Sequence, residues 1–301
     1  MSGDRKYRSG TVALVGRPNA GKSTLLNRLV GAKVAITSDK PQTTRHRILG
    51  VLTRPEGQLI FVDTPGVHRP HYRMNKRMMD TTRAALRDVD LVALLIDVTE
   101  ESGGGVRFVI DLVGGVDVPV FLLLNKVDRI PKPKLLPMIQ QYGEKAEWAE
   151  VIPISALKGD NCESFLEAAL GYLPEGGPLY PEDTLTDRSE RFLTAELVRE
   201  QLLRHTRDEL PFTTAVAVDS WEEPERPGGV VRIFATIFVD AESQKPIVIG
   251  RRGSMLKKVG TAARAQIEQM LGRRVFLDLR VKVRSGWREH APSLDELEID
   301  S

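Results

Sequence analysis

Residues 16–23 of this 301-residue chain, Gly-Arg-Pro-Asn-Ala-Gly-Lys-Ser, have the spacing of a phosphate-binding loop: a glycine, four residues, then Gly-Lys-Ser. An apolar segment predicted as a strand, 11–15, precedes the loop, and a helical pattern, 24–30, follows it. Glycines let backbone N–H groups curl around an anion at the start of a helix, where the helix dipole also favours phosphate. Lys22 would bring positive charge to the β- and γ-phosphates of a nucleotide, and the Ser23 hydroxyl suits Mg²⁺.

A second motif, Asp63-Thr-Pro-Gly66, follows the strand predicted at 59–62. Alone, such a tetrapeptide is most often a turn. Placed after a phosphate loop and at the end of a strand, its acid can hold the Mg²⁺ shell. Gly66, which has no side chain, would let its backbone N–H approach a γ-phosphate closely.

Two further motifs, Asn125-Lys-Val-Asp128 and Ser155-Ala-Leu-Lys158, each follow an apolar predicted strand and could read a base. The Asp128 carboxylate can accept hydrogen bonds from the guanine ring N–H and the exocyclic amine together, whereas adenine presents no such donor pair. The long stem of Lys126 could lie along the base, and backbone N–H groups of the last motif suit the base carbonyl.

All four motifs follow predicted strands, and that edge of an open α/β sheet is where ligands bind. Their order predicts a Mg²⁺-dependent GTPase.

The polar loop 38–47 occupies the place of a first switch, where a threonine reaches Mg²⁺ only when the γ-phosphate is present, and we favour Thr44 over Thr43. The residues expected to bind GTP are Gly16, Arg17, Pro18, Asn19, Ala20, Gly21, Lys22, Ser23, Thr24, Asp63, Thr64, Pro65, Gly66, Val67, Asn125, Lys126, Val127, Asp128, Ser155, Ala156 and Leu157. Those expected to hold Mg²⁺ are Ser23, Thr44 and Asp63, and those expected to act in catalysis are Lys22, Thr44 and Gly66.

The elements around these motifs predict two domains. Residues 10–173 alternate apolar runs with helical patterns, which indicates an α/β fold: a mostly parallel sheet with helices on both faces. A Pro- and Gly-rich stretch, 174–183, has turn chemistry. From Ser189 the predicted order is a helix (192–206), two strands (213–220 and 230–240), a second helix (254–271) and a final strand (275–283), which is typical of a small α+β domain. We therefore predict a P-loop GTPase domain at 1–175, a linker at 176–188, an α+β domain at 189–285 and a C-terminal tail at 286–301.

The second predicted domain contains Gly250-Arg-Arg-Gly253 directly before a helix predicted at 254–271. The tetrapeptide alone proves little, but apolar residues at steps of three and four give that helix one buried face. Glycines at a helix start admit a phosphate backbone, and the arginines add charge. The residues expected to bind RNA are Gly250, Arg251, Arg252, Gly253, Lys257 and Lys258.

On these motifs the chain resembles the Era family of bacterial GTPases. The matching segments, over roughly residues 8–285, are Gly16–Ser23, Pro41–Arg47, Asp63–His68, Asn125–Asp128 and the second-domain element order, which is similar to a KH domain of type II topology. The resemblance implies binding of the single-stranded 3′ end of 16S ribosomal RNA and assistance in assembly of the 30S ribosomal subunit. It also implies peripheral contact with the inner membrane. The single cysteine and the lack of an apolar stretch near the start of the chain predict a cytoplasmic protein, and we expect a monomer.

Two residues bear on the rate of hydrolysis. Many regulatory GTPases place a water-orienting Gln directly after Asp-x-x-Gly, and here that residue is Val67. We therefore expect slow unassisted turnover. In related GTPases an Asn at the position of Asn19 is associated with a bound K⁺ near the phosphates, which could supply positive charge there. Stabilisation of its own loop by Asn19 is the alternative.

Composition names no partner, since 43 Lys and Arg stand against 41 Asp and Glu. A local excess exists between Asp240 and His290, with twelve basic and five acidic residues, although a solvated helix face would give the same pattern. The apolar runs are much shorter than the roughly 18–20 residues of a membrane-spanning helix. The single cysteine, Cys162, is expected to pack as a small apolar residue.

Other interpretations stay open at this point. A signalling GTPase could use the second domain as an adaptor for a protein partner, and an RNA-binding module could carry its GTPase half as a structural relic. His46, His68 and His71 lie near the two switches and are expected to be surface-loop residues without a chemical role. Ser293-Leu-Asp-Glu296 fits a helix-capping box, which leaves two expectations open, a final short helix or a frayed end.

Overall fold

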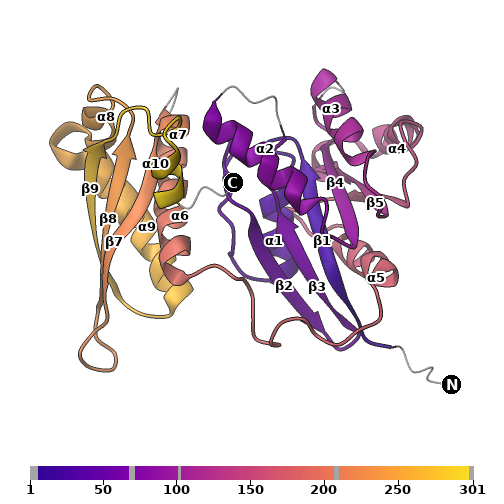
Figure 1. Ribbon diagram of the computed structural model, residues 1–301, viewed down its shortest axis with the longest axis horizontal. Coiled ribbons are helices and arrows are strands. Elements are labelled where there is room, and N and C mark those ends of the chain that lie inside the picture. The colour runs from indigo at the N-terminus through magenta and orange to yellow at the C-terminus, as the bar shows by residue number, and fades with distance from the viewer. Residues whose placement is uncertain (1–5, 68–71, 101–102, 207–209, 298–301) are drawn as a thin grey trace.

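The computed structural model describes residues 6–67, 72–100, 103–206 and 210–297, and it forms two lobes joined by a single connection (Figure 1). The larger lobe contains a six-stranded sheet in the order β2-β3-β1-β4-β5-β6. All neighbouring strands are parallel except β2 and β3. The strands are β1 (Arg8–Gly16), β2 (Ile48–Arg54), β3 (Gly57–Asp63), β4 (Leu91–Asp97), β5 (Val120–Asn125) and β6 (Glu150–Ile154).

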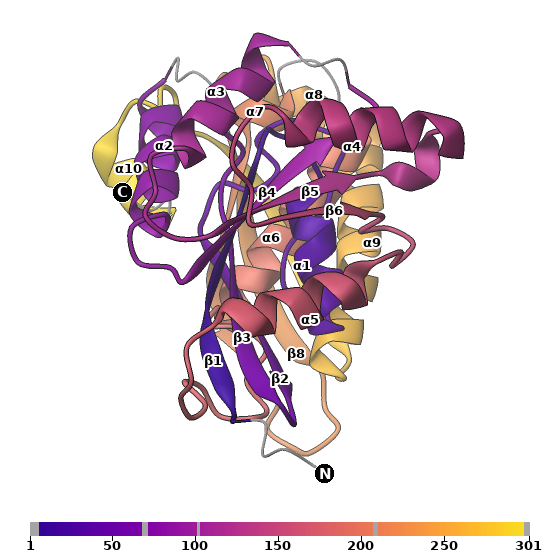
Figure 2. The ribbon, with the colours of Figure 1, turned by 90° about the vertical axis from the view of Figure 1, so that its right-hand side faces the viewer.

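Helices cover both faces of this sheet, as the sequence predicts. They are α1 (Lys22–Val30), α2 (Arg73–Ala85), α3 (Gly104–Val113), α4 (Leu135–Gly143) and α5 (Cys162–Tyr172), with 3₁₀ turns at Val127–Arg129 and Lys132–Lys134. Alternate residues of β1 enter opposite cores: Val12 and Leu14 pack with α1 and α5, whereas Ala13 and Val15 pack with α2, α3 and α4. Figure 2 views this lobe from β6, with α3 and α4 above and α5 in front. Cys162 is buried in the first of these cores, which confirms its predicted packing.

The smaller lobe is a three-stranded sheet, β7-β8-β9, with β7 and β8 antiparallel and β8 and β9 parallel. Its elements are α6 (Glu190–His205), α7 (Leu210–Thr213), β7 (Ala215–Glu222), β8 (Val231–Val239), α8 (Lys245–Ile249), a 3₁₀ turn (Arg251–Gly253), α9 (Ser254–Leu271) and β9 (Val275–Val283). Helices α6 and α9 pack against each other beside the sheet. Val259, Ala263 and Ile267 form the buried stripe that the spacing of α9 predicts.

The segment beyond β9 is packed between the two lobes. Trp287 and Leu294 are fully buried, and they contact Met74 and Met78 of α2 and Phe238 of β8. This segment ends in α10 (Ala291–Glu296), so a short final helix is present. The predicted cap at Ser293 is wrong, because the helix begins two residues earlier after His290 and Ser293 lies inside it.

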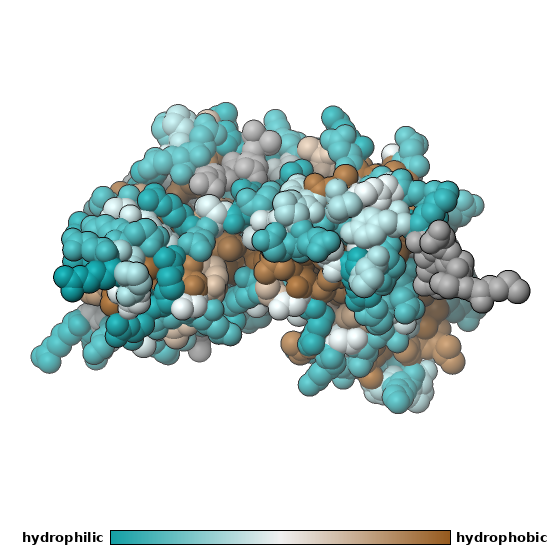
Figure 3. Space-filling model, turned by 90° about the horizontal axis from the view of Figure 1, so that it is seen from below, coloured by the Kyte–Doolittle hydropathy of each residue, from teal (hydrophilic) through white to brown (hydrophobic). Residues whose placement is uncertain are grey.

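Seen from below (Figure 3), apolar residues form a band across the middle of the molecule, between the hydrophilic surfaces of the two lobes. Within the described residues, no helix combines the length and the apolar character needed to cross a membrane.

Candidate nucleotide site and nucleic-acid interface

A cavity of about 590 Å³ lies at the carboxyl ends of the parallel strands. Twelve of the residues predicted to bind GTP line it: Pro18, Asn19, Gly21, Lys22, Ser23, Thr24, Gly66, Asn125, Lys126, Asp128, Ala156 and Leu157. The structure places the others outside that lining: Gly16, Arg17, Ala20, Asp63, Thr64, Pro65, Val67, Val127 and Ser155. Thr64, for example, is fully buried and donates its hydroxyl hydrogen to the carbonyl of Leu14 at 2.8 Å.

The phosphate loop is folded around Lys22, which is only 5% exposed. Its Nζ donates to the carbonyl oxygens of Gly16 and Arg17 at 3.1 and 3.2 Å. Burial lowers the pKa of Lys22, and the nearby Asp63 carboxylate opposes that shift. A buried ammonium held by carbonyls at the start of α1 is suited to an anionic ligand.

Asn125 connects the phosphate loop to the loops predicted to read the base. Its Nδ2 donates to the Ala20 carbonyl at 2.7 Å, and its Oδ1 accepts from the Ala156 N–H at 3.0 Å. Gly21, at φ +100°, lies directly against this amide, where a Cβ would collide with Nδ2. The two ends of the cavity are therefore held in a fixed relation by one buried side chain.

Three oxygen-bearing side chains converge beside the phosphate loop. Ser23 Oγ donates to Asp63 Oδ2 at 2.6 Å and lies 2.8 Å from Thr44 Oγ1. Thr43 instead donates to the Lys40 carbonyl at 2.6 Å, so the structure brings Thr44, not Thr43, to this cluster. Burial raises the pKa of Asp63 to about 6, and the charge of Lys22 limits the rise. Among the described residues, Asp63 Oδ1 is buried without a hydrogen-bond partner.

At the other end of the cavity, Ser155 Oγ donates to Asp128 Oδ1 at 2.6 Å. Lys126 has a left-handed backbone (φ +69°) and forms an ion pair with Asp97, a residue that sequence reasoning missed. Asp97 stands at the end of β4 and lines the cavity. The signal that could have found it is the one used for Asp63, an acid at the carboxyl end of a buried parallel strand.

The residue after Asp-Thr-Pro-Gly points away from the cavity. Val67 is 2% exposed and packs in the core with Met79 and Leu86. Its N–H donates to the Gly16 carbonyl at 3.1 Å. A side chain at this position therefore faces the core and not the space where a hydrolytic water would approach a nucleotide.

The first switch region packs along the second domain. We call residues 33–46 the switch I strap. Near its end, Arg45 is 1% exposed and donates to the carbonyls of Thr214, Pro211 and Phe212 at 2.8, 3.0 and 3.2 Å. Sequence motifs gave no sign of these contacts between lobes.

His46 is also part of this contact, which makes its predicted surface placement wrong. It is 5% exposed, its ring lies edge-on to Phe192 of α6 with centroids 4.9 Å apart, and it is 4.0 Å from the Glu196 carboxylate. Glu196 is held in turn by Arg199, at 2.6 Å. His68 and His71 lie outside the described residues.

The Gly-x-x-Gly loop presents a basic surface at the start of α9. Gly250 and Gly253 adopt φ of +74° and +77°, and Arg252 between them adopts +49°. The side chains of Arg251, Arg252, Lys257 and Lys258 are exposed. Ile247 beside the loop is 50% exposed. An anionic backbone could therefore approach the loop with an apolar side chain next to it.

The fold and these sites define a GTPase that carries a KH domain. A family model described as "50S ribosome-binding GTPase" matches residues 11–126, and a KH domain model matches residues 209–288. The GTPase Era of Geobacter metallireducens is 48% identical over 294 residues, 98% of either chain. The GTPase Era of Lactobacillus delbrueckii subsp. bulgaricus is 47% identical over 300 residues, 100% of this chain and 99% of that one. The chain belongs to the Era family of GTPases.

Two solved structures are similar over nearly the whole chain. One is Era in complex with MgGDPNP and nucleotides 1506–1542 of 16S ribosomal RNA, with a TM-score of 0.95, 40% identity, and coverage of 98% of this chain and 100% of that one. The other is an Aquifex aeolicus Era variant bound to GDP.AlF4⁻, with a TM-score of 0.94 and the same identity and coverage. The likeness covers both lobes and hence their relative placement.

Proposed function

We propose that this chain is a GTP-dependent RNA-binding protein that holds the 3′ end of 16S ribosomal RNA and assists assembly of the 30S subunit. The observation that carries this proposal is the likeness across both lobes to Era in complex with MgGDPNP and a 16S ribosomal RNA segment. The protein acts as a monomer in the cytoplasm. Contact with the inner membrane stays a prediction of the family resemblance alone.

RNA is held at the Gly-x-x-Gly loop. The space beside Gly253 is open to a phosphate, whereas Gly250 packs closely against Met255, and the exposed Arg251, Arg252, Lys257 and Lys258 supply positive charge. The exposed side chain of Ile247 offers an apolar contact to a base. The remaining residues assigned to GTP in the sequence act behind the cavity wall by fixing the loops that line it.

Ser23, Thr44 and Asp63 are the residues that would hold Mg²⁺. Their fit rests on the convergence of two hydroxyls and a buried carboxylate that has one unpartnered oxygen, and oxygen ligands are those Mg²⁺ prefers. When bound, the ion neutralises charge on the β- and γ-phosphates. Lys22 stabilises phosphate charge, Asp128 reads guanine, and Gly66 lets the backbone approach the γ-phosphate. A Cβ at Gly66 would meet Pro18 at 2.8 Å, so glycine is also what lets this loop pack closely on the phosphate loop.

Hydrolysis is slow without help, because the core-facing Val67 cannot position water. Asn19 is the candidate ligand for K⁺. Its Nδ2 donates to the Asp39 carbonyl at 2.6 Å, which leaves the amide oxygen on the opposite side. We expect faster hydrolysis in KCl than in NaCl and loss of this difference in Asn19→Ala. Equal rates in both salts would remove K⁺ from the proposal.

The test of RNA binding uses two glycines at opposite ends of α9. Gly253 and Gly272 have similar backbones (φ +77° and +63°) and open space where a Cβ would stand. Gly253→Asp places a carboxylate in the RNA loop, whereas Gly272→Asp imposes the same strain and charge at the far end. We expect only Gly253→Asp to abolish binding of an oligonucleotide that matches the 3′ end of 16S ribosomal RNA. RNA binding that survives in both variants would favour the alternative, a signalling GTPase whose second domain contacts a protein.

A further inference from the structure

The switch I strap runs along the cavity from its base end to its phosphate end. It begins beside α1, where the N–H groups of Val34 and Ala35 both donate to Asn27 Oδ1 at 2.9 Å. The next residue of α1, Arg28, donates to the carbonyl of Leu157 in the base-reading loop. The beginning of the strap is therefore tied to the base end.

The later part of the strap is tied to the phosphate end. The Asp39 carbonyl accepts from Asn19 of the phosphate loop at 2.6 Å, and Thr44 reaches Ser23 at 2.8 Å. Residues 36–38 lie between these two ends and line the same cavity. In a nucleotide the sugar joins the base to the phosphates, so the part of the cavity beside residues 36–38 takes the ribose.

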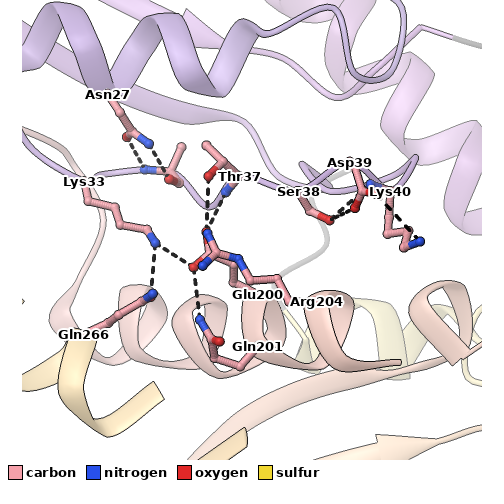
Figure 4. Close-up of polar contacts among 11 residues, drawn as sticks. Asn27, Lys33, Thr37, Ser38, Asp39, Lys40, Glu200, Gln201, Arg204 and Gln266 are labelled. Carbon is pink, nitrogen blue, oxygen red and sulfur yellow. Dashed lines mark hydrogen bonds and ion pairs between the residues drawn. The ribbon is translucent and has the colours of Figure 1, made fainter. Parts of the chain in front are cut away.

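A side chain of the second domain reaches this middle section. Arg204, in the last turn of α6, lines the cavity and has 43% of its side chain exposed. Its Nη2 lies 3.2 Å from Glu200 Oε1, and the same oxygen accepts the N–H of Thr37 at 2.9 Å (Figure 4). The Glu200 carboxylate is completely buried, and its other oxygen pairs with Lys33 at 2.6 Å. One buried acid thus places both the strap and the Arg204 guanidinium.

We propose that Arg204 binds the ribose hydroxyls of the guanine nucleotide, so that the KH domain contributes a side chain to the GTP site. A guanidinium has five N–H donors, of which the ion pair with Glu200 uses only part, and hydroxyl oxygens accept such bonds. The proposal rests on the base and phosphate ends assigned under the proposed function. It has one consequence for the whole molecule: any movement that withdraws α6 removes a nucleotide contact.

The test pairs a protein change with a ligand change. Titration calorimetry on the full chain would compare the β,γ-imidotriphosphates of guanosine and 2′,3′-dideoxyguanosine. We expect Arg204→Ala to weaken guanosine analogue binding about tenfold, as for one lost hydrogen bond to a charged group. The wild type should bind the dideoxy analogue more weakly than the guanosine analogue. In Arg204→Ala, this preference for the guanosine analogue should be about tenfold smaller than in the wild type. Arg191→Ala, at the exposed other end of α6, should behave as the wild type.

Two results would overturn the ribose contact: unchanged affinities in Arg204→Ala, or equal losses for both analogues, which would place the guanidinium on the strap or the phosphates. Asp128→Asn, measured in parallel, keeps this inference separate from the site assignment. If that variant binds guanosine analogues normally, the assignment of the base end itself is wrong. If it loses them while Arg204→Ala binds normally, only the role of Arg204 fails.

Discussion

Asp128 is the exposed side chain that we propose to select guanine, and the structure gives it a defined place. It lines the cavity at the end opposite Lys22, and Ser155 Oγ orients one carboxylate oxygen at 2.6 Å. Its backbone follows β5, whose register with β4 and β6 is fixed by parallel pairing. A carboxylate held in this way can accept from two neighbouring N–H donors of a guanine.

Asp128→Asn should change the preferred base from guanine to xanthine. The amide replaces one acceptor by a donor, which suits the second carbonyl that xanthine has in place of the guanine amine. We expect GTP affinity to fall by about 10–100-fold, from a lost charged hydrogen bond of about 1.5–3 kcal/mol, and XTP affinity to rise. Competition between GTP and XTP for the full chain measures this, with Asp111→Asn on the exposed face of α3 as the control. An unaltered GTP preference would contradict the role of Asp128.

Val67→Gln tests whether the missing glutamine limits hydrolysis. Because the Val67 side chain lies in the core, the new amide would be buried without partners and should lower the free energy of unfolding by about 1–3 kcal/mol. The turnover number should not rise. Denaturant unfolding and single-turnover hydrolysis measure the two effects. A several-fold faster variant of unchanged stability would show that a side chain at this position can turn toward the nucleotide.

At the scale of elements, the segment after β9 acts as a wedge between the lobes. The Trp287 indole donates to the Thr213 carbonyl at 3.0 Å, and the Arg45 guanidinium lies 5.5 Å from the ring centre. The ring thus contacts the end of α7 and the switch I strap at once. From the sequence, residues 286–301 are expected to be a tail, but the part of them that the structure describes is packed into a core.

Trp287→Ala should lower the free energy of unfolding by about 3–5 kcal/mol, as is usual when a fully buried tryptophan is truncated. Thermal unfolding of the variant would measure this, and Trp221→Ala is the matched control. Trp221 is partly exposed on β7, where it packs at the edge of the core and its indole N–H donates to the Glu223 carboxylate, so we expect a smaller loss. Equal losses in the two variants would mean that the wedge adds no stability of its own.

The elements also show what a sequence can reveal. The bounds of α9 and β9 agree with the predicted ranges, 254–271 and 275–283, because their apolar periodicity and flanking glycines are local signals. Helix α8 was not predicted, since five residues are too few to show a period. The placement of His46 and Arg204 depends on packing between segments far apart in the chain, and no local pattern records it. Asp97 differs, because its position at the end of a buried strand is a signal that the sequence does carry.

For the whole molecule, the contact between lobes is built largely on the first switch. Arg45 is buried among backbone carbonyls of the second domain, and Arg199 of α6 donates to the Thr43 carbonyl beside Thr44. Burial lowers the pKa of Arg45, with the nearby Arg199 adding to the shift. The segment that brings Thr44 to Ser23 is thus the segment on which the KH domain rests. This arrangement supports the proposal that nucleotide state sets the hold on RNA.

Arg45→Met should weaken that coupling. The variant keeps much of the side-chain volume but loses three hydrogen bonds to the second domain. The strap can then become ordered around the nucleotide without changing the position of the KH domain. We expect the ratio of RNA affinities in the GTP analogue and in GDP to fall toward one. Arg47→Met, on an exposed residue of the same loop, is the control. A ratio that stays as in the wild type would place the coupling elsewhere.

The most direct measurement of the central claim is the binding of a labelled oligonucleotide that matches the 3′ end of 16S ribosomal RNA. A shuffled oligonucleotide is compared with it, each in GDP and in a non-hydrolysable GTP analogue, at one fixed salt concentration. We predict tight binding of the matching sequence alone, and tighter binding in the GTP analogue than in GDP. Binding that ignores both sequence and nucleotide would contradict the account and leave a GTPase with a merely basic second domain.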